Sequence, residues 1–247
     1  MNYSHFSSRK VLEIEKIIIH ERYSSPTVEH DIALLKLKEK VDLSIYTPAC
    51  LAPKDADYTG KTASVYGWGD HFEILDCEKS KPKPNISSVL KQTTQTIESN
   101  DKCKQGNGTI RVCDAQGNVQ LENVSMANHS RIHGFTDDML CGYNSGTGFC
   151  HGDSGGPLTV DVDGKHTLVG VVSWSYGCAE VSVPQVWINT NSISIYFRRT
   201  SRMFTAVWLP IENGLTRRSR ATGEATSVML NNCFQCKTSL FCVWRVS

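Results

Sequence analysis

The segment from residue 150 to residue 157 constrains this chain more than any other stretch of its sequence. It reads Cys-His-Gly-Asp-Ser-Gly-Gly-Pro, which is a poor start for a helix or a regular strand. Gly155 and Gly156 permit backbone angles and close approaches that a side chain would forbid. The segment therefore predicts a tight loop that exposes the hydroxyl of Ser154 beside inward-pointing backbone N–H groups. Acyl transfer requires this combination of a nucleophile and donors for an oxyanion.

The same segment fits a second pattern, the Gly-x-Ser-x-Gly nucleophile elbow of α/β-hydrolases. An elbow needs a strand–turn–helix unit, with an acid and then a histidine after the serine. Here Gly-Gly-Pro cannot open a good helix, and His166 is the only histidine downstream of Ser154. Because His166 follows a turn-like Asp-Gly-Lys sequence, it is poorly placed as a general base. We therefore favour the loop over the elbow.

Composition narrows the possible partners and compartment. A chain of 247 residues with 40% apolar residues can bury a sizeable core in one domain or in two small ones. The net charge of +1 gives no case for nucleic acid or a membrane surface as a partner, and no apolar run is long enough to span a bilayer. Ten cysteines indicate an oxidising, extracellular compartment. The sequence also holds N-glycosylation motifs at Asn2, Asn85, Asn107, Asn123 and Asn128.

The N-terminus conflicts with an extracellular location. Its first ten residues are polar and lack the apolar core of a signal peptide. We therefore expect a secreted protein whose sequence here is incomplete at its N-terminus. Three of the glycosylation motifs crowd into one segment, which predicts a surface loop.

Two segments near the N-terminus have strand character. Residues 11–19 are rich in β-branched residues, although a helix remains possible for so short a run. Residues 31–37, Asp-Ile-Ala-Leu-Leu-Lys-Leu, predict a second strand with Asp31 at its start. An aspartate in that position is most often satisfied by local backbone donors.

Taken together, these motifs resemble those of the chymotrypsin/trypsin-like (S1) serine peptidases. Residues 150–157 resemble the family's active-site serine segment, and residues 31–37 resemble the segment that carries its triad aspartate, about 120 residues earlier. Gly67-Trp68-Gly69 resembles the entry to the second barrel. The resemblance covers about residues 11–187 and implies an all-β fold of two Greek-key antiparallel β-barrels, with the active site between them. Only the closing strands of the first barrel are expected here.

The resemblance also implies a domain organisation. Residues 1–53 are expected to be the remnant of the first barrel and a connector. Residues 54–190 are expected to form the second barrel, with an inserted loop at about residues 104–138. Residues 191–247 diverge from the family and are expected to form a poorly packed tail.

The resemblance assigns roles to residues around the serine. Ser154 is the expected nucleophile, Asp31 the orienting acid, and the N–H groups of Gly152 and Ser154 the oxyanion donors. Asp153 is expected to pair with the ammonium group that activation cleavage frees in this family. The primary pocket is expected at Gly148, its floor, and at Ser173, Trp174, Ser175 and Gln185.

The side chain of Gln185 is expected to project into that pocket and narrow it. Trypsin-like members hold an aspartate where this chain has Gly148, so we do not expect cleavage after basic residues.

The expected catalytic histidine is missing. The family carries it before the aspartate, in an Ala-Ala-His-Cys-like segment that this chain lacks. His5, His20 and His30 precede Asp31, but they are expected to be solvated surface residues. We therefore expect a serine endopeptidase by family whose present sequence is inactive. The alternative is a non-catalytic homologue that binds partners through its loops.

The resemblance further implies the disulfides Cys150–Cys178 and Cys103–Cys141. Cys50 matches a position that ties some members to a light chain or propeptide. The pairing of Cys77, Cys113, Cys233, Cys236 and Cys242 stays open, and Cys77 with Cys113 is a guess. One Cys-x-x-Cys at Cys233 and Cys236 is a weak zinc signal, so no metal or cofactor is expected. The expected partners are protein or peptide substrates and protein inhibitors.

Overall fold

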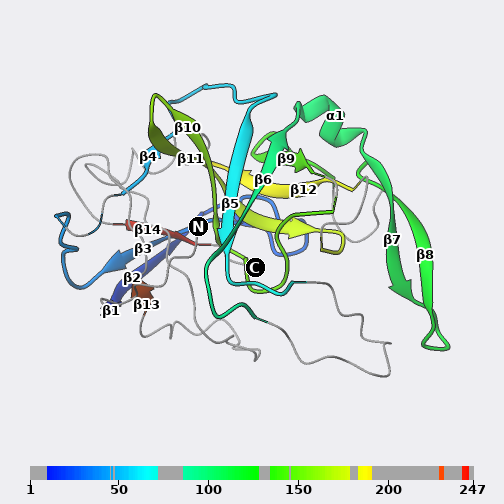
Figure 1. Cartoon of the computed structure of the whole chain (residues 1–247), viewed down its shortest axis with the longest axis horizontal. Coiled ribbons are helices and arrows are strands. Elements are labelled where there is room, and N and C mark those ends of the chain that lie inside the picture. Colours follow the sequence, from blue (N-terminus) through cyan, green and yellow to red (C-terminus); the bar gives the residue numbers. More distant parts are fainter. Residues whose placement is uncertain are drawn as a thin grey trace.

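The computed structural model describes residues 10–44, 46, 48–71, 86–127, 134–144, 146–178, 183–190, 228–230 and 241–244. Apart from the short helix α1 (Asn100–Lys104), its regular elements are strands, so the predicted all-β class is confirmed (Figure 1). In chain order these strands are β1 (Lys10–Leu12), β2 (Ile14–Ile19), β3 (Ala33–Leu37), β4 (Cys50–Leu51), β5 (Thr62–Gly67), β6 (Lys91–Ile97), β7 (Asn107–Cys113), β8 (Val119–Ser125), β9 (Met139–Tyr143), β10 (Pro157–Val162), β11 (Lys165–Ser175), β12 (Gln185–Asn189), β13 (Val228–Leu230) and β14 (Phe241–Trp244).

Six antiparallel strands between residues 62 and 189 close into a barrel. Their order is β10-β5-β6-β9-β12-β11, and the pairing of β10 with β11 closes the ring. Strand β4 adds to β11 in parallel, with Cys50 opposite Thr167. Closure gives each barrel strand a neighbour on both sides, so the barrel has no free edge. It also holds the loops at the barrel ends in fixed positions.

Trp187 lies at the centre of the barrel core. The side chain is completely buried on β12, and its ring meets the ring of Phe149 edge-on at a centroid distance of 5.3 Å. Two glycines make room for this indole. A Cβ on Gly170 would lie 2.9 Å from the Trp187 Cβ, and a Cβ on Gly142 would lie 3.2 Å from its ring. The bulkiest core residue therefore depends on strand positions without side chains.

The N-terminal strands form a separate small sheet that shares a core with the barrel. Its order is β14-β3-β2, and β1 pairs with β13. Ile32 and Leu34 pack in one hydrophobic cluster with barrel residues that include Met139 and Trp174. This contact joins the sheet at the left of Figure 1 to the barrel.

Residues 228–230 and 241–244 belong to the segment that was expected to be a poorly packed tail. The structure instead pairs them as strands with β1 and β3. The first barrel is represented, within the described residues, by these short strands and β2.

The inserted segment differs from the predicted loop. The helix α1, capped by the Ser99 hydroxyl, is followed by a regular hairpin of β7 and β8. In the turn of the hairpin, the Asp114 carboxylate accepts hydrogen bonds from the N–H groups of Gln116 and Asn118, at 2.9 and 2.7 Å. This Asx-type turn explains why a polar stretch forms ordered strands. No helix in the described ranges is long and apolar enough to cross a membrane.

Candidate active site

The segment around Ser154 is a tight turn between the barrel core and β10. Its backbone is held by hydrogen bonds from Asp153 N to Cys150 O at 3.0 Å and from Gly156 N to Asp153 O at 2.9 Å. Gly152 has a φ of +96°, a conformation that side chains rarely adopt, and a Cβ there would lie 3.1 Å from the Cα of Gly69. The residue Ser154 is exposed at this turn.

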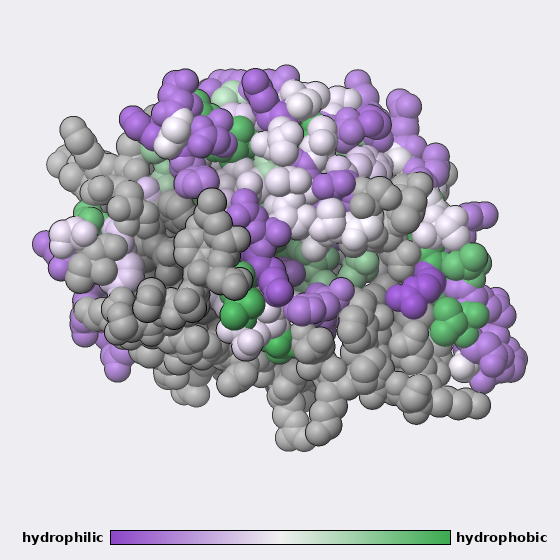
Figure 2. Space-filling view, viewed as in Figure 1, coloured by the Kyte–Doolittle hydropathy of each residue, from purple (hydrophilic) through white to green (hydrophobic). Residues whose placement is uncertain are grey.

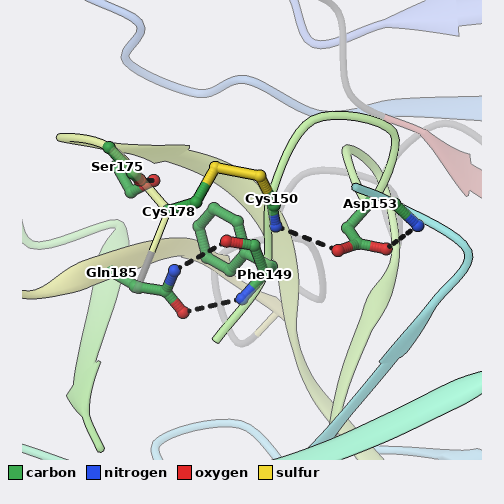
Figure 3. The surroundings of a disulfide bond; sticks show 8 residues. Phe149, Cys150, Asp153, Ser175, Cys178 and Gln185 are labelled. Carbon is green, nitrogen blue, oxygen red and sulfur yellow. Dashed lines mark hydrogen bonds between the residues drawn. A yellow bond between two sulfur atoms is a disulfide. The ribbon is translucent and has the colours of Figure 1, made fainter. Parts of the chain in front are cut away.

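The carboxylate of Asp153 points into the barrel end and is held by backbone donors. It accepts hydrogen bonds from Gly69 N at 2.7 Å and Cys150 N at 2.9 Å (Figure 3). Two glycines leave the space for it, because a Cβ on Gly67 would lie 1.7 Å from Asp153 Oδ1 and one on Gly69 would lie 2.5 Å from its carboxyl carbon. These close approaches explain why positions 67 and 69 are both glycine.

Burial raises the pKa of Asp153, while the N–H groups of Cys150 and Gly69 act in the opposite direction. A cavity of ≈ 290 Å³ lies beside this carboxylate. Its lining comes from β5, β6 and the loops around the serine turn, namely Val65, Tyr66, Gly67, Gly69, Asp70, His71, Lys91, Gln92, Thr93, Gly146, Thr147, Gly148, Cys150, Asp153 and Cys178. The structure thus places a half-buried carboxylate at the wall of an open cavity.

Asp31 is completely buried where the N-terminal sheet meets the barrel. The hydroxyl of Ser173 on β11 donates a hydrogen bond to Asp31 Oδ2 at 2.9 Å. Ser173 was expected as part of the primary pocket, which stays a prediction, and its hydrogen bond to Asp31 was not foreseen. A buried carboxylate that accepts hydrogen bonds suits the role of orienting a partner group.

Gln185 fills space beside Gly148 (Figure 3). Its side chain is 4% exposed, and its amide makes two hydrogen bonds with the backbone of Phe149, from Phe149 N to Oε1 at 2.9 Å and from Nε2 to Phe149 O at 2.8 Å. A Cβ on Gly148 would lie only 2.1 Å from Gln185 Oε1. The other expected pocket residues lie on β11, where Trp174 is buried and the Ser175 hydroxyl donates to Gly177 O at 2.6 Å.

The structure contains both disulfides that the resemblance implied. Cys150–Cys178 ties the serine turn to the segment after β11, and Cys103–Cys141 ties α1 to β9. Cys113 also forms a disulfide, and its partner lies outside the residues whose side chains are described. Cys77, Cys233 and Cys236 lie outside the described residues, and no side-chain position is described for Cys242. Within the described residues, no group of three or more His, Cys, Asp or Glu side chains could hold a metal ion.

Comparison with known proteins agrees with this geometry. The family model described as Trypsin matches residues 2–195. The chain belongs to the trypsin family. Serine proteinase stubble of Drosophila melanogaster is 34% identical over 178 residues, which cover 70% of this chain and 19% of that protein.

Two further relatives of this trypsin-family chain match it over longer stretches at lower identity. Trypsin 5G1 of Aedes aegypti is 30% identical over 201 residues, covering 80% of this chain and 62% of the relative. Human tissue-type plasminogen activator is 28% identical over 204 residues, covering 77% of this chain and 31% of the relative. The chain therefore spans less than two thirds of the length of each of these relatives.

In this trypsin-family chain, His20 and His30 are not the solvated surface residues that the sequence predicted. His20 is 4% exposed rather than solvated, and its ring stacks on that of His30 at a centroid distance of 4.6 Å. The Nδ1 atom of His20 accepts a hydrogen bond from Arg22 N at 3.2 Å. His30 N and Nδ1 lie 2.9 and 3.0 Å from Asp138 Oδ2. The His30 ring thus contacts the segment before β9, and the His20 ring stacks on it.

Sequence reasoning missed Asp138, because nothing in its local sequence connects it with His30, which lies 108 positions away along the chain. It also did not foresee the left-handed backbone of His30, whose φ is +52°. His5 lies outside the described residues.

The His20 environment predicts acid sensitivity. Burial, followed by the charges of His30 and Arg22, lowers the pKa of His20 to about 4, against the opposing charges of Asp138 and Glu21. The folded protein therefore binds fewer protons than the unfolded chain between pH 6.5 and about 4. The contribution of His20 to the free energy of unfolding is fully present above the unfolded pKa of 6.5. It is lost as the pH falls through this window. We expect a loss of about 1–2 kcal/mol after allowance for solvent screening.

Urea denaturation at several pH values checks this expectation. In a His20→Gln variant, the decrease in unfolding free energy across the acid window should become shallower than in the unmodified protein. His166→Gln, at an exposed position on β11, is the matched control and should leave the pH profile unchanged. Parallel profiles for the unmodified protein and His20→Gln would contradict the assignment.

Proposed function

We propose that this chain carries the peptide-cleaving site of a serine endopeptidase. The observation that carries the proposal is the presence, in one trypsin-family fold, of Ser154 exposed on a glycine turn and a fully buried Asp31. In this mechanism Ser154 Oγ attacks the peptide carbonyl carbon, and its proton passes to a histidine held by Asp31. The N–H groups of Gly152 and Ser154 stabilise the oxyanion. The C–N bond then breaks, the amine leaves with the proton, and water hydrolyses the acyl-enzyme.

We further propose that the histidine of the parent enzyme is not among residues 1–247, which makes this sequence inactive by itself. The contacts of His20 and His30 support this, because both rings are already held by other groups. The cavity beside Asp153 supports the further proposal that activation includes binding of a freed ammonium group next to this carboxylate. An ammonium group entering that cavity would pair with the Asp153 carboxylate and offset its burial.

The pocket geometry supports a restricted substrate preference. Because the Gln185 amide lies directly against Gly148, a long basic side chain would meet an uncharged amide there instead of a carboxylate. Peptides with small side chains at the cleaved position fit this site better. The filled pocket also favours the second candidate function, a non-catalytic homologue that binds protein partners through its loops.

The proposed setting is extracellular. The two disulfides of the barrel support it, because such bonds persist in oxidising compartments. Protein substrates and protein inhibitors are the proposed partners, and Cys50, half-buried on β4, is the proposed attachment point for a light chain or propeptide. Of the proposed glycosylation sites, Asn107 and Asn123 are exposed, whereas Asn85 and Asn128 lie outside the described residues.

A hybrid protein tests the peptidase assignment. The N-terminal segment of an active trypsin-family relative, including its histidine and activation site, is joined ahead of residue 11. After activation, a fluorophosphonate probe should label Ser154, and the same hybrid with Ser154→Ala should not react. A hybrid that folds, as judged by circular dichroism, but shows no Ser154-dependent labelling would favour the non-catalytic homologue.

A further inference from the structure

The β7–β8 hairpin carries an apolar strip on one face. In the register of the hairpin, Thr109 lies opposite Asn123, Arg111 opposite Leu121, and Cys113 opposite Val119, so these six residues share a face. Leu121 is 74% exposed and Val119 is 44% exposed. Figure 2 shows hydrophobic residues at the right flank of the molecule, where Figure 1 places the hairpin.

Within the described residues, β7 and β8 pair only with each other, and a disulfide at Cys113 ties the end of β7 to a segment outside them. Val124 is the one buried residue of β8, and together with Met126 it packs at the base of the hairpin. A two-stranded hairpin is only marginally stable by itself in water. A covalently attached group that shields the exposed leucine and valine of such a strand from water therefore stabilises the hairpin.

Asn123 is positioned to carry such a cover. It begins the sequence Asn123-Val124-Ser125, it is exposed, and it lies two residues from Leu121 on the same face, a spacing of about 7 Å along a strand. The Thr109 hydroxyl donates a hydrogen bond to Asn123 Oδ1 at 3.1 Å. N-glycosylation modifies Nδ2 and leaves Oδ1 as an acceptor, so this hydrogen bond survives the modification.

We propose that Asn123 carries an N-linked glycan whose first sugars lie along β8 and cover Leu121 and Val119. In the transfer, Asn123 Nδ2 bonds to the anomeric carbon of a lipid-pyrophosphate-linked oligosaccharide. The carbon–oxygen bond to the pyrophosphate breaks, the lipid pyrophosphate leaves, and Nδ2 loses one proton to the transferase. The proposal rests on the extracellular setting proposed above, and it needs no peptidase activity.

Asn107 provides a matched comparison on the same hairpin. It lies opposite Ser125 at the base, and its Nδ2 atom donates a hydrogen bond to Gln105 O at 2.9 Å. A glycan on Asn107 would begin four residue pairs away from the Arg111–Leu121 pair, whereas one on Asn123 begins two pairs away. Modification of Asn107 therefore leaves the apolar strip uncovered.

Occupancy is tested by producing the full chain behind a cleavable secretory leader in a eukaryotic cell line. The purified protein is treated with peptide N-glycosidase in ¹⁸O-water, and the peptide that contains Asn123 is analysed by mass spectrometry. Conversion of Asn123 to ¹⁸O-labelled aspartate supports the proposal, and an unmodified Asn123 overturns it. Because fluorophosphonate labelling of Ser154 reads the peptidase assignment separately, failure of one proposal is distinguishable from failure of the other.

The covering role is tested by removing each glycan in turn. Asn123→Gln should raise the fluorescence of a hydrophobic dye bound to the folded protein by about twofold, whereas Asn107→Gln should not. Adding Leu121→Thr to Asn123→Gln should return the signal to its original level. Equal dye binding by the two single variants would overturn the covering role.

Discussion

The 247-residue protein is expected to show no detectable labelling of Ser154 by a fluorophosphonate probe. The reaction needs a base near Ser154 Oγ, and the rings of His20 and His30 are held by each other, by the Arg22 backbone and by Asp138. Loss of one triad member lowers the rate of such enzymes by about four to six orders of magnitude. The labelling rate should fall below that of a complete trypsin-family enzyme by a comparable factor.

Two variants make this result interpretable. Ser154→Ala sets the background, and an active trypsin-family enzyme in the same reaction shows that the probe is competent. Labelling that disappears in Ser154→Ala would mean that this chain supplies its own base. His20→Gln and His30→Gln would then identify which ring provides it.

A Gln185→Gly variant is expected to open the space beside Gly148 that the Gln185 amide fills in the unmodified protein, and so to create a site for a small apolar ligand. The substitution removes an amide that is 4% exposed and fills the space beside Gly148, so a cavity with an uncharged floor should remain. A small neutral aromatic such as indole should bind with a dissociation constant of about 1 mM. Loss of the two hydrogen bonds to Phe149 should cost about 1–3 kcal/mol of stability.

Titration followed by NMR chemical shifts measures this binding. Gln95→Ala is the matched control, because Gln95 is also a buried glutamine, 1% exposed, whose amide donates to a backbone oxygen, that of Thr147, at 2.7 Å. That variant should lose stability without gaining an indole site. Saturable binding to the unmodified protein, or none to a folded Gln185→Gly, would refute the pocket-filling role of Gln185.

The sequence could predict the parts of the fold that depend on local patterns. The strand within residues 31–37, observed at Ala33–Leu37, follows from an apolar run, and the glycine turn at Ser154 follows from backbone freedom. The family resemblance added the barrel and both described disulfides. The resemblance also predicted that Gln185 projects into the primary pocket, which stays a prediction. The amide pairing of Gln185 with Phe149 required the structure, because it depends on how β12 meets the segment before Cys150.

Contacts between segments that are distant along the chain could not be predicted from the sequence. The polar side chain of His20 suggested a solvated position, but stacking on His30 and the contacts at Asp138 bury it. The hairpin of β7 and β8 has few apolar residues, so the inserted segment resembled a loop. Its order comes from the Asp114 turn and the cross-strand pairing instead.

The pairing of β14 with β3 bears on how this protein is synthesised. Ala33 lies opposite Trp244, so β3 gains this neighbour only after the segment more than 200 residues further along the chain has left the ribosome. Until then the growing polypeptide exposes one side of β3, with its run of buried leucines, to other molecules. Long-range pairing of this kind slows folding and prolongs exposure to aggregation. A chaperone that protects the nascent N-terminal segment would therefore raise the yield of folded protein.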